Sequence, residues 1–183
     1  MAAIAAAAAA TVIGGIQAYA SSVALDNQDR LFMEAVIRAG LFELRSGDLA
    51  LQRASRDEVR AYARAVLGDQ AMARAKLLAV ATAKSRAVPS VVGAEQKTVL
   101  AELKSAPREA FDTLYLEKVA VEGQSAVVAL LKRTVRNSND PDIRAYAASV
   151  LPTRQRHLDQ ARKLQIELRW TVMAENAAKP SLN

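Results

Sequence analysis

Apolar residues recur along most of the chain at steps of three, four and seven positions, the spacing of one face of an α-helix. The stripes comprise Phe32, Val36, Ala39, Glu43, Ala50 and Ala54; Val59, Ala63, Val66, Gln70, Ala73, Leu77 and Val80; Phe111, Leu114, Val121, Gln124, Val128, Leu131 and Val135; and Ile143, Ala147, Val150, Arg154, His157, Ala161, Leu164 and Leu168. Each stripe predicts a long amphipathic helix that turns this face toward a shared core.

Local signals predict the ends of the first two helices. Asp26 or Asn27 can cap the first helix, which we expect to end near Ala54. Residues 55–58, SRDE, have the pattern of a capping box, in which a serine hydroxyl and a glutamate three positions later satisfy each other's backbone amides. The second helix should therefore begin there, and it fades near Arg86.

The ends of the other two long helices carry comparable signals. Ser105 can cap the third helix, with Pro107 in its first turn, and the pattern continues to about Arg136. Asp140 can cap the fourth helix. Pro152 falls inside that helix and should kink it or interrupt one hydrogen bond.

Residues 94–104, AEQKTVLAELK, predict a short amphipathic helix lying across the others, between the second and third long helices. The sequence shows no notable alternation of the kind that predicts strands. The predicted fold class is all-α, a four-helix bundle over residues 27–173 with a short crossing helix between helices 2 and 3. Residues 174–183 are expected to form a flexible tail.

The composition fits this fold and removes several kinds of chemistry. The chain has 183 residues, of which 51% are hydrophobic and only 4% aromatic, so long helices packed through alanine are favoured in a single domain. There is no cysteine, which excludes disulfides, thiolate nucleophiles and iron–sulfur clusters. His157 is the one histidine, so no site can draw two histidines from one chain.

The charge is positive but dispersed. A net charge of +6 permits binding to nucleic acids or to anionic surfaces. The arginines and lysines are interspersed with acids, and few aromatic side chains are available to stack on bases, so no nucleic acid partner is expected. Binding to an anionic surface remains as an alternative, and it predicts membrane association that weakens with salt.

The first 22 residues form an uncharged apolar run that contains Ala18-Tyr19-Ala20 before Ser21. Small residues at those positions fit a signal-peptidase site, so residues 1–20 are expected to be a signal peptide, although the run lacks a basic beginning. A retained membrane anchor is the alternative. Both interpretations place the domain outside the cytoplasm, in the periplasm.

Each long stripe includes a polar residue: Glu43, Gln70, Gln124 and His157, with Arg154 one turn before the histidine. If these side chains meet, Glu43 and His157 can pair between the two amides in a structural polar layer that fixes helix register. Two alternatives are a metal or small-ligand site, and a layer that partly faces solvent. A dimetal centre is not expected because the chain has no Glu-x-x-His. No catalytic residue, metal or cofactor is expected.

Three stretches carry a resemblance to a known family: FMEAVIRAGLFELRSGDLALQRASRDEVRAYARAVLGDQ, FDTLYLEKVAVEGQSAVVALL and IRAYAASVLPTRQRHLDQARKL. They resemble an exported bacterial family of unknown function, of the DUF4142 type, over about residues 30–164. The resemblance implies a ferritin-like four-helix fold and an exported location. Members commonly have histidine where this chain has Gln70 and Gln124, so two inward imidazoles are replaced by amides that neither titrate near neutral pH nor bind metals well.

Two functions follow as hypotheses. The first is a non-catalytic periplasmic bundle that acts through its surface as an accessory or interaction subunit with a protein partner and peripheral membrane association. One version is a small subunit of a membrane-associated periplasmic oxidoreductase, by analogy of size and compartment with acetic-acid-bacterial alcohol dehydrogenases. The alternative is a metal- or small-ligand-binding stress protein that uses the Glu43/His157 layer.

Overall fold

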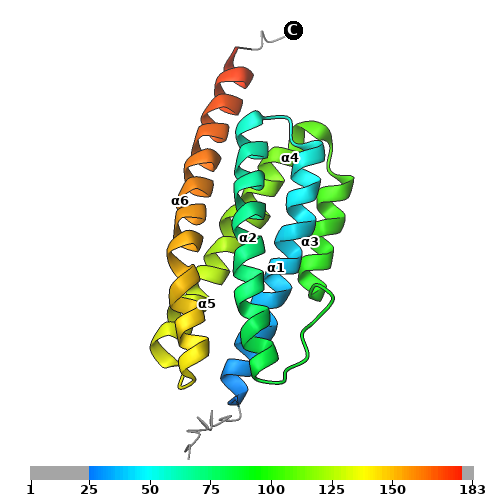
Figure 1. Cartoon of the computed structure of the whole chain (residues 1–183). Coiled ribbons are helices and arrows are strands. Elements are labelled where there is room, and N and C mark those ends of the chain that lie inside the picture. Colours follow the sequence, from blue (N-terminus) through cyan, green and yellow to red (C-terminus); the bar gives the residue numbers. More distant parts are fainter. Residues whose placement is uncertain (1–24, 179–183) are drawn as a thin grey trace, which may run out of the picture.

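The computed structural model describes residues 25–178, whose regular structure is entirely helical (Figure 1). In chain order the elements are α1 (Asn27–Arg53), α2 (Asp57–Ala83), α3 (Ala94–Ser105), α4 (Arg108–Leu114), the π-helix η1 (Tyr115–Gly123), α5 (Gln124–Asn137) and α6 (Pro141–Ala177). Within these described residues, no helix is both long enough and apolar enough to cross a membrane.

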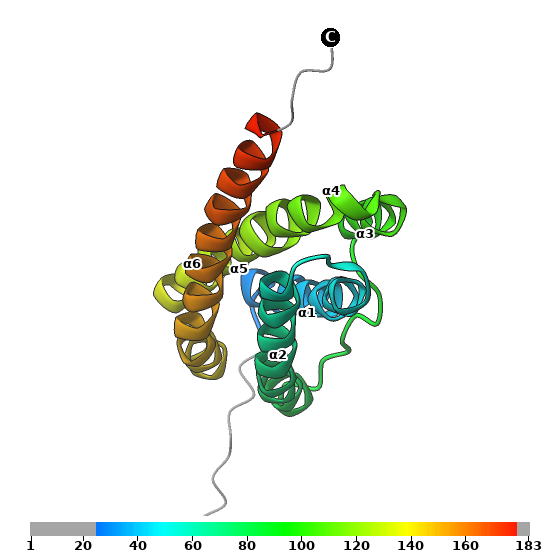
Figure 2. The same ribbon diagram turned by 90° about the horizontal axis from the view of Figure 1, so that it is seen from above.

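The long helices pack side by side as a helical bundle. α4, η1 and α5 follow one another without a break in helical backbone and form one rod, which lies beside α1 and α6, while α2 lies between α1 and α6 (Figures 1 and 2). The prediction that residues 94–104 cross the bundle was wrong. α3 runs beside α1, along the length of the bundle and on its outside.

Two predicted helix starts are confirmed. The Asp26 carboxylate accepts a hydrogen bond of 2.8 Å from the Asp29 amide and caps α1. The Asp140 carboxylate accepts from the amides of Asp142 and Ile143 at 3.0 and 3.1 Å, so it caps α6. Lys84, just after α2, reaches the other Asp140 oxygen at 2.7 Å and ties the two helix ends together.

The predicted capping box at the start of α2 was wrong. The Ser55 hydroxyl contacts the Arg108 carbonyl instead of capping its own helix. The buried carboxylate of Asp112, on α4, accepts from the Ser55 amide at 3.0 Å and the Arg56 amide at 2.9 Å. The free backbone amides at this corner are therefore satisfied by a side chain from a distant part of the sequence.

The predicted third helix also differs from the structure at its start. Ser105 is the last residue of α3, and its hydroxyl bonds to the Ala101 carbonyl within that helix. Pro107 precedes the first residue of α4. A proline suits a helix start because its missing N–H would have had no partner there.

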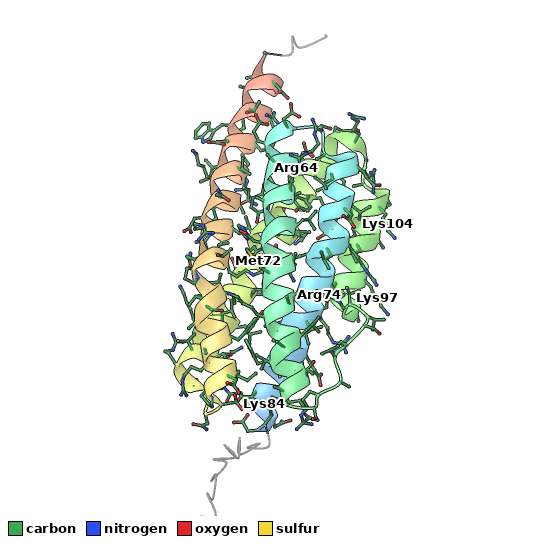
Figure 3. All side chains as sticks on the ribbon, in the orientation of Figure 1. Arg64, Met72, Arg74, Lys84, Lys97 and Lys104 are labelled. Carbon is green, nitrogen blue, oxygen red and sulfur yellow. The ribbon has the colours of Figure 1, made fainter. Side chains whose placement is uncertain are left out.

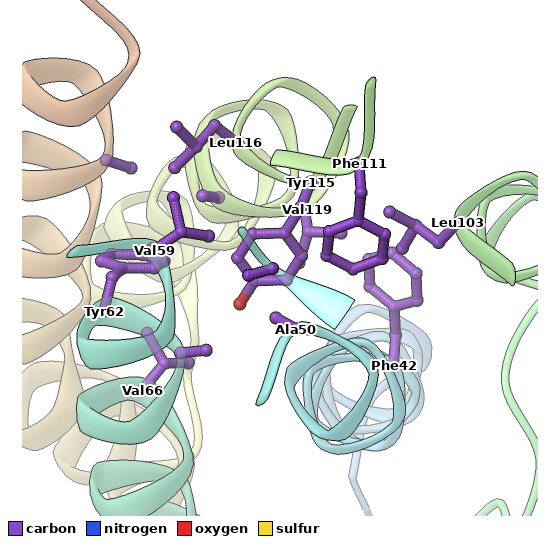
Figure 4. Close-up of a cluster of buried hydrophobic side chains, with 14 of the residues drawn as sticks. Phe42, Ala50, Val59, Tyr62, Val66, Leu103, Phe111, Tyr115, Leu116 and Val119 are labelled. Atoms are coloured by element: carbon purple, nitrogen blue, oxygen red, sulfur yellow. The ribbon is translucent and has the colours of Figure 1, made fainter. Parts of the chain in front are cut away.

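The core is divided into two apolar clusters. One lies around Tyr115 and Phe111 toward the end of the bundle where α1 meets α2 (Figure 4), and the other around Leu131 and Ile143 toward the opposite end. Most predicted inward positions are buried, which confirms the stripes. The half-buried exceptions are Ala39, Val80, Leu114, Val121, Val135 and Leu164. Figure 3 shows charged side chains covering the outside, including Arg64 and Arg74.

The described residues include the start of the predicted tail but none of the predicted signal peptide. The expected signal peptide, residues 1–20, lies outside the described residues. The tail expected from Ala174 begins later, because α6 continues to Ala177. Glu175, in this last turn, lies 3.7 Å from Arg56 at the start of α2, so this part of the helix still contacts the bundle.

Candidate functional site

A hydrogen-bonded polar network, made of Glu43, Gln70, Gln124 and Arg154, joins the long helices between the two apolar clusters. Nη1 of Arg154 donates to both oxygens of the Glu43 carboxylate, at 2.6 and 2.7 Å. Nη2 of Arg154 donates to the Gln70 carbonyl oxygen. Nε2 of Gln124 donates to Glu43 at 3.0 Å. All four residues are at most 5% exposed.

The charges inside the polar network balance. Burial opposes the positive charge of Arg154, but the adjacent Glu43 carboxylate raises the pKa of the guanidinium above its usual value. The cation therefore persists in the core and neutralises the carboxylate. An arginine suits this position because its planar group can donate in two directions at once.

Gln124 reaches Glu43 because of the π-helix that precedes it. Along this rod, pairs of adjacent buried residues repeat every four positions, and the pairs begin at Phe111, Tyr115 and Val119. An uninterrupted α-helix would next turn Gly123 inward. The wider π turn, with bonds spanning five residues, places Gln124 there instead.

Gln70 reaches Arg154 because α1 carries a glycine beside it. A Cβ atom at Gly40 would lie 2.1 Å from the Gln70 amide nitrogen, so any other residue there would push this amide from its place. The position of the Gln70 amide between α1 and α2 thus depends on the absence of a side chain at Gly40. Gly68, in the same pair of helices, has nothing within 4 Å of such an atom.

Gly40→Ala should lower the free energy of unfolding by about 1 kcal/mol, because the amide must move away and its bond to Arg154 is lost. Gly68→Ala is the matched control. It should raise the free energy of unfolding by about 0.5–1 kcal/mol through helix propensity alone. Urea unfolding of both variants checks the pair, and stabilisation of similar size in both would contradict the packing around Gln70.

His157 does not pair with Glu43, so that prediction was wrong. Its Nε2 atom lies 2.9 Å from a carboxylate oxygen of Asp69, on α2, and its ring lies edge-on to Tyr62. Arg154, one turn earlier, takes the place beside Glu43. Of the four predicted residues, Glu43, Gln70 and Gln124 are brought together through Arg154, and His157 lies beside them with a different partner.

Burial and the nearby Arg154 cation lower the pKa of His157 despite the Asp69 carboxylate. The folded ring is therefore neutral at pH 7, with the proton on Nε2 shared with Asp69. In the unfolded chain this histidine takes up a proton near pH 6.5, as an ordinary imidazole does. The unfolded state therefore gains protons first as the pH falls, and stability present at neutral pH is lost below about pH 6.5.

His157→Gln should flatten the loss of stability between about pH 6.5 and 5, because glutamine does not titrate and can still donate to Asp69. Thermal unfolding at several pH values measures this slope. His157 is the chain's single histidine, which makes the assignment direct. An unchanged slope in the variant would show that folding does not lower the pKa of His157.

Two tyrosines border the polar network. Burial, the larger cause, and the Glu43 carboxylate raise the pKa of Tyr115, and burial also raises that of Tyr62. Both phenols are therefore protonated and uncharged at neutral pH. The Tyr62 hydroxyl and the Gln124 carbonyl oxygen are buried without a hydrogen-bond partner among the described residues.

Two hollows lead toward the polar network. A groove of about 310 Å³ lies between α1, α3, η1 and α5, and its lining is largely apolar, with Phe42, Val127 and Leu130 among its walls and Glu43 among its acids. A smaller hollow of about 60 Å³ lies between α2 and α6 and includes Asp69 and Arg154. In residues 25–178, no three His, Cys, Asp or Glu side chains gather so that they could hold a metal ion.

The helical stripes did not include two acids that matter here. Asp69 belongs to no predicted stripe, and its side chain is 35% exposed, so periodicity could not mark it as the partner of His157. Asp112 is buried next to Phe111, and periodicity presents it only as a charge at the edge of an apolar face. Its partners, 57 and 56 residues earlier, leave no local signal.

Comparison with known proteins gives one family and one solved structure. Residues 15–164 match the model described as a domain of unknown function, DUF4142. The crystal structure of a DUF305 fragment from Deinococcus radiodurans superposes with a TM-score of 0.68 at 14% identity, over 78% of this chain and 98% of that one. No curated protein matches. At this identity the structural likeness shows a shared helical fold.

Proposed function

The chain belongs to the DUF4142 family, and from that premise we propose that it is a non-catalytic, exported helical-bundle protein that serves as an accessory or interaction subunit in the periplasm. The proposal includes a ferritin-like four-helix arrangement with α3 as an added helix. It also includes removal of residues 1–20 and attachment to a membrane-associated oxidoreductase complex as one form of the role.

The observation that carries this proposal is that the Arg154 guanidinium donates hydrogen bonds to both oxygens of the Glu43 carboxylate. The carboxylate that could have served as a ligand or a base has both oxygens held by one guanidinium, and Gln124 adds a further donor. Gln70 bonds to the same guanidinium. A charge-balanced network of this kind supports a structural role, in which these side chains hold the helices together. The functional contacts would then be made by the surface of the bundle.

The test is whether partner binding survives removal of the polar network. A tagged full chain and its Glu43→Met/Arg154→Met double variant are each purified from the native organism, after circular dichroism has shown that the variant is folded. We expect both to retain the same partner in fixed stoichiometry. Recovery of the wild type without such a partner, or loss of the partner from the folded double variant, would overturn the proposal.

A second candidate is the binding of a small apolar ligand, and the groove beside Glu43 favours it. Its volume of about 310 Å³ falls at the lower end of the range for small-molecule sites. Its walls combine apolar side chains with a few acids, a mixture typical of such sites. The metal-binding version is less well supported, because Glu43 is held by Arg154 and His157 by Asp69.

A neutral fluorescent probe, N-phenyl-1-naphthylamine, tests this candidate. Its emission should rise on binding to the wild type and should not rise with Ala126→Phe, whose ring would fill the groove. Ala129→Phe is the control, because Ala129 is exposed on the same helix and does not line the groove. Equal emission from both variants would count against a ligand in this groove.

A further inference from the structure

The last part of α6 exposes an apolar stripe on its outer side. Ile166, Trp170 and Met173 are 56, 69 and 63% exposed, and their spacing of four and three residues places them on one face. Leu168, on the opposite face, is buried, and Glu175 contacts Arg56. This part of the helix is thus held by the bundle on its inner side, while its outer side carries large apolar side chains in solvent. Figure 1 shows where this end of α6 lies on the bundle.

Basic residues flank this stripe on both sides. Arg162 precedes Ile166 by four residues, Arg169 precedes Met173 by four, and Lys163 precedes Trp170 by seven, so all three cations share the face of the apolar residues. All three are exposed. Glu167 lies 3.8 Å from Lys163 and offsets part of that charge. Asp159, one turn before Lys163, accepts a hydrogen bond from Gln155 at 3.1 Å, and Glu175 lies 3.7 Å from Arg56.

We infer that this outer face of α6, centred on Trp170, docks onto an anionic lipid surface. A helix with tryptophan and aliphatic side chains between cations has the pattern of an interfacial helix, in which the apolar side chains enter the headgroup region. Tryptophan prefers that region, and the cations are attracted to anionic headgroups. The face is convex, so one flat anionic surface can meet the stripe and all three cations together. This inference goes beyond the accessory role and does not depend on it.

Trp170 is the chain's single tryptophan and therefore reports on this face directly. The full chain is mixed with vesicles of phosphatidylcholine containing about a third phosphatidylglycerol, and with vesicles of phosphatidylcholine alone. With the anionic vesicles we expect a blue shift of Trp170 emission and protection from acrylamide quenching, both reversed by high salt. Binding through the apolar N-terminal segment instead would bring the protein to the vesicles without changing this emission, and that result would overturn the inference.

Charge-matched variants separate this face from the overall positive charge. Arg162→Gln/Arg169→Gln should weaken binding to the anionic vesicles roughly thirty-fold, from about five-fold for each cation. Arg64→Gln/Arg74→Gln removes the same charge from α2 (Figure 3) and should change binding far less. Equal losses in the two variants would overturn the inference.

Two further outcomes would also overturn the inference. One is a blue shift that depends on protein concentration and occurs without vesicles, which would assign the face to a second copy of the chain. The other is a blue shift produced only by a copurifying protein. If the chain retains its protein partner but does not bind the anionic vesicles, this inference is wrong and the accessory role is unaffected.

Discussion

Arg154→Met should lower the free energy of unfolding by about 3 to 5 kcal/mol. The variant keeps the length and apolar stem of the side chain but leaves the Glu43 carboxylate buried with Gln124 as its remaining donor. An ionised carboxylate without a countercharge in the core costs far more than a lost surface contact. Urea unfolding followed by circular dichroism measures the difference, with the slope of the transition checked for two-state behaviour.

Two companion variants give this prediction its control. Arg156→Met, two residues along α6, removes a cation whose side chain is 64% exposed, and it should change stability by less than about 0.5 kcal/mol. Glu43→Met/Arg154→Met removes both charges and should recover more than half of the loss, because no unpaired charge remains. If the double variant were less stable than Arg154→Met, an unpaired Glu43 carboxylate would not be the cause of the loss, and our view of the polar network would be wrong.

Asp112→Ala should lower the free energy of unfolding by about 2 kcal/mol, the upper range for the loss of a helix cap. The carboxylate is buried and accepts from the Ser55 and Arg56 amides, which have no other acceptor in the described structure. Without it, two backbone donors at the corner between α1 and α2 lose a charged partner. Chemical unfolding gives the magnitude, and hydrogen exchange at these amides gives the location.

Two milder substitutions test the cause. Asp112→Asn keeps one carbonyl oxygen and should cost about half as much as alanine. Asp48→Ala removes an exposed acid from α1 and should have little effect. Exchange at Ser55 and Arg56 that is no faster in Asp112→Ala than in the wild type would show that these amides do not depend on the carboxylate.

The fold was largely predictable because most of the helices obey a single period. The α6 stripe from Ile143 to Leu168 follows steps of three and four, and all but Leu164 of its members are buried. The same rule failed on the third long helix, where Tyr115 and Ala120 are buried instead of Leu114 and Val121. A π-helix changes the period within the segment, so a template of 3.6 residues per turn assigns the wrong face there.

The residues of the candidate site could be predicted from the sequence, but the predicted pairing between them was wrong. Periodicity shows that Glu43, Gln70, Gln124 and His157 face inward, and their burial agrees. Periodicity does not give the positions of the helices relative to one another along the bundle axis. These positions decide that Arg154 and not His157 lies beside Glu43. The family resemblance is confirmed by the match over residues 15–164.

The π-helix has a consequence for how this chain tolerates insertion and deletion. Deleting one residue between Tyr115 and Gly123 would let the segment close into ordinary α-helix without turning α5 relative to α4, because the π turn holds one residue more than an α turn. Closing the segment into α-helix with all of its 9 residues in place would instead turn α5 by about 100°. Val127 and Leu131 would then leave the interior together, although neither had been altered. The residue count of this segment and its π turn therefore depend on each other, because the helices at both ends of the rod keep their inward faces only when the two change together.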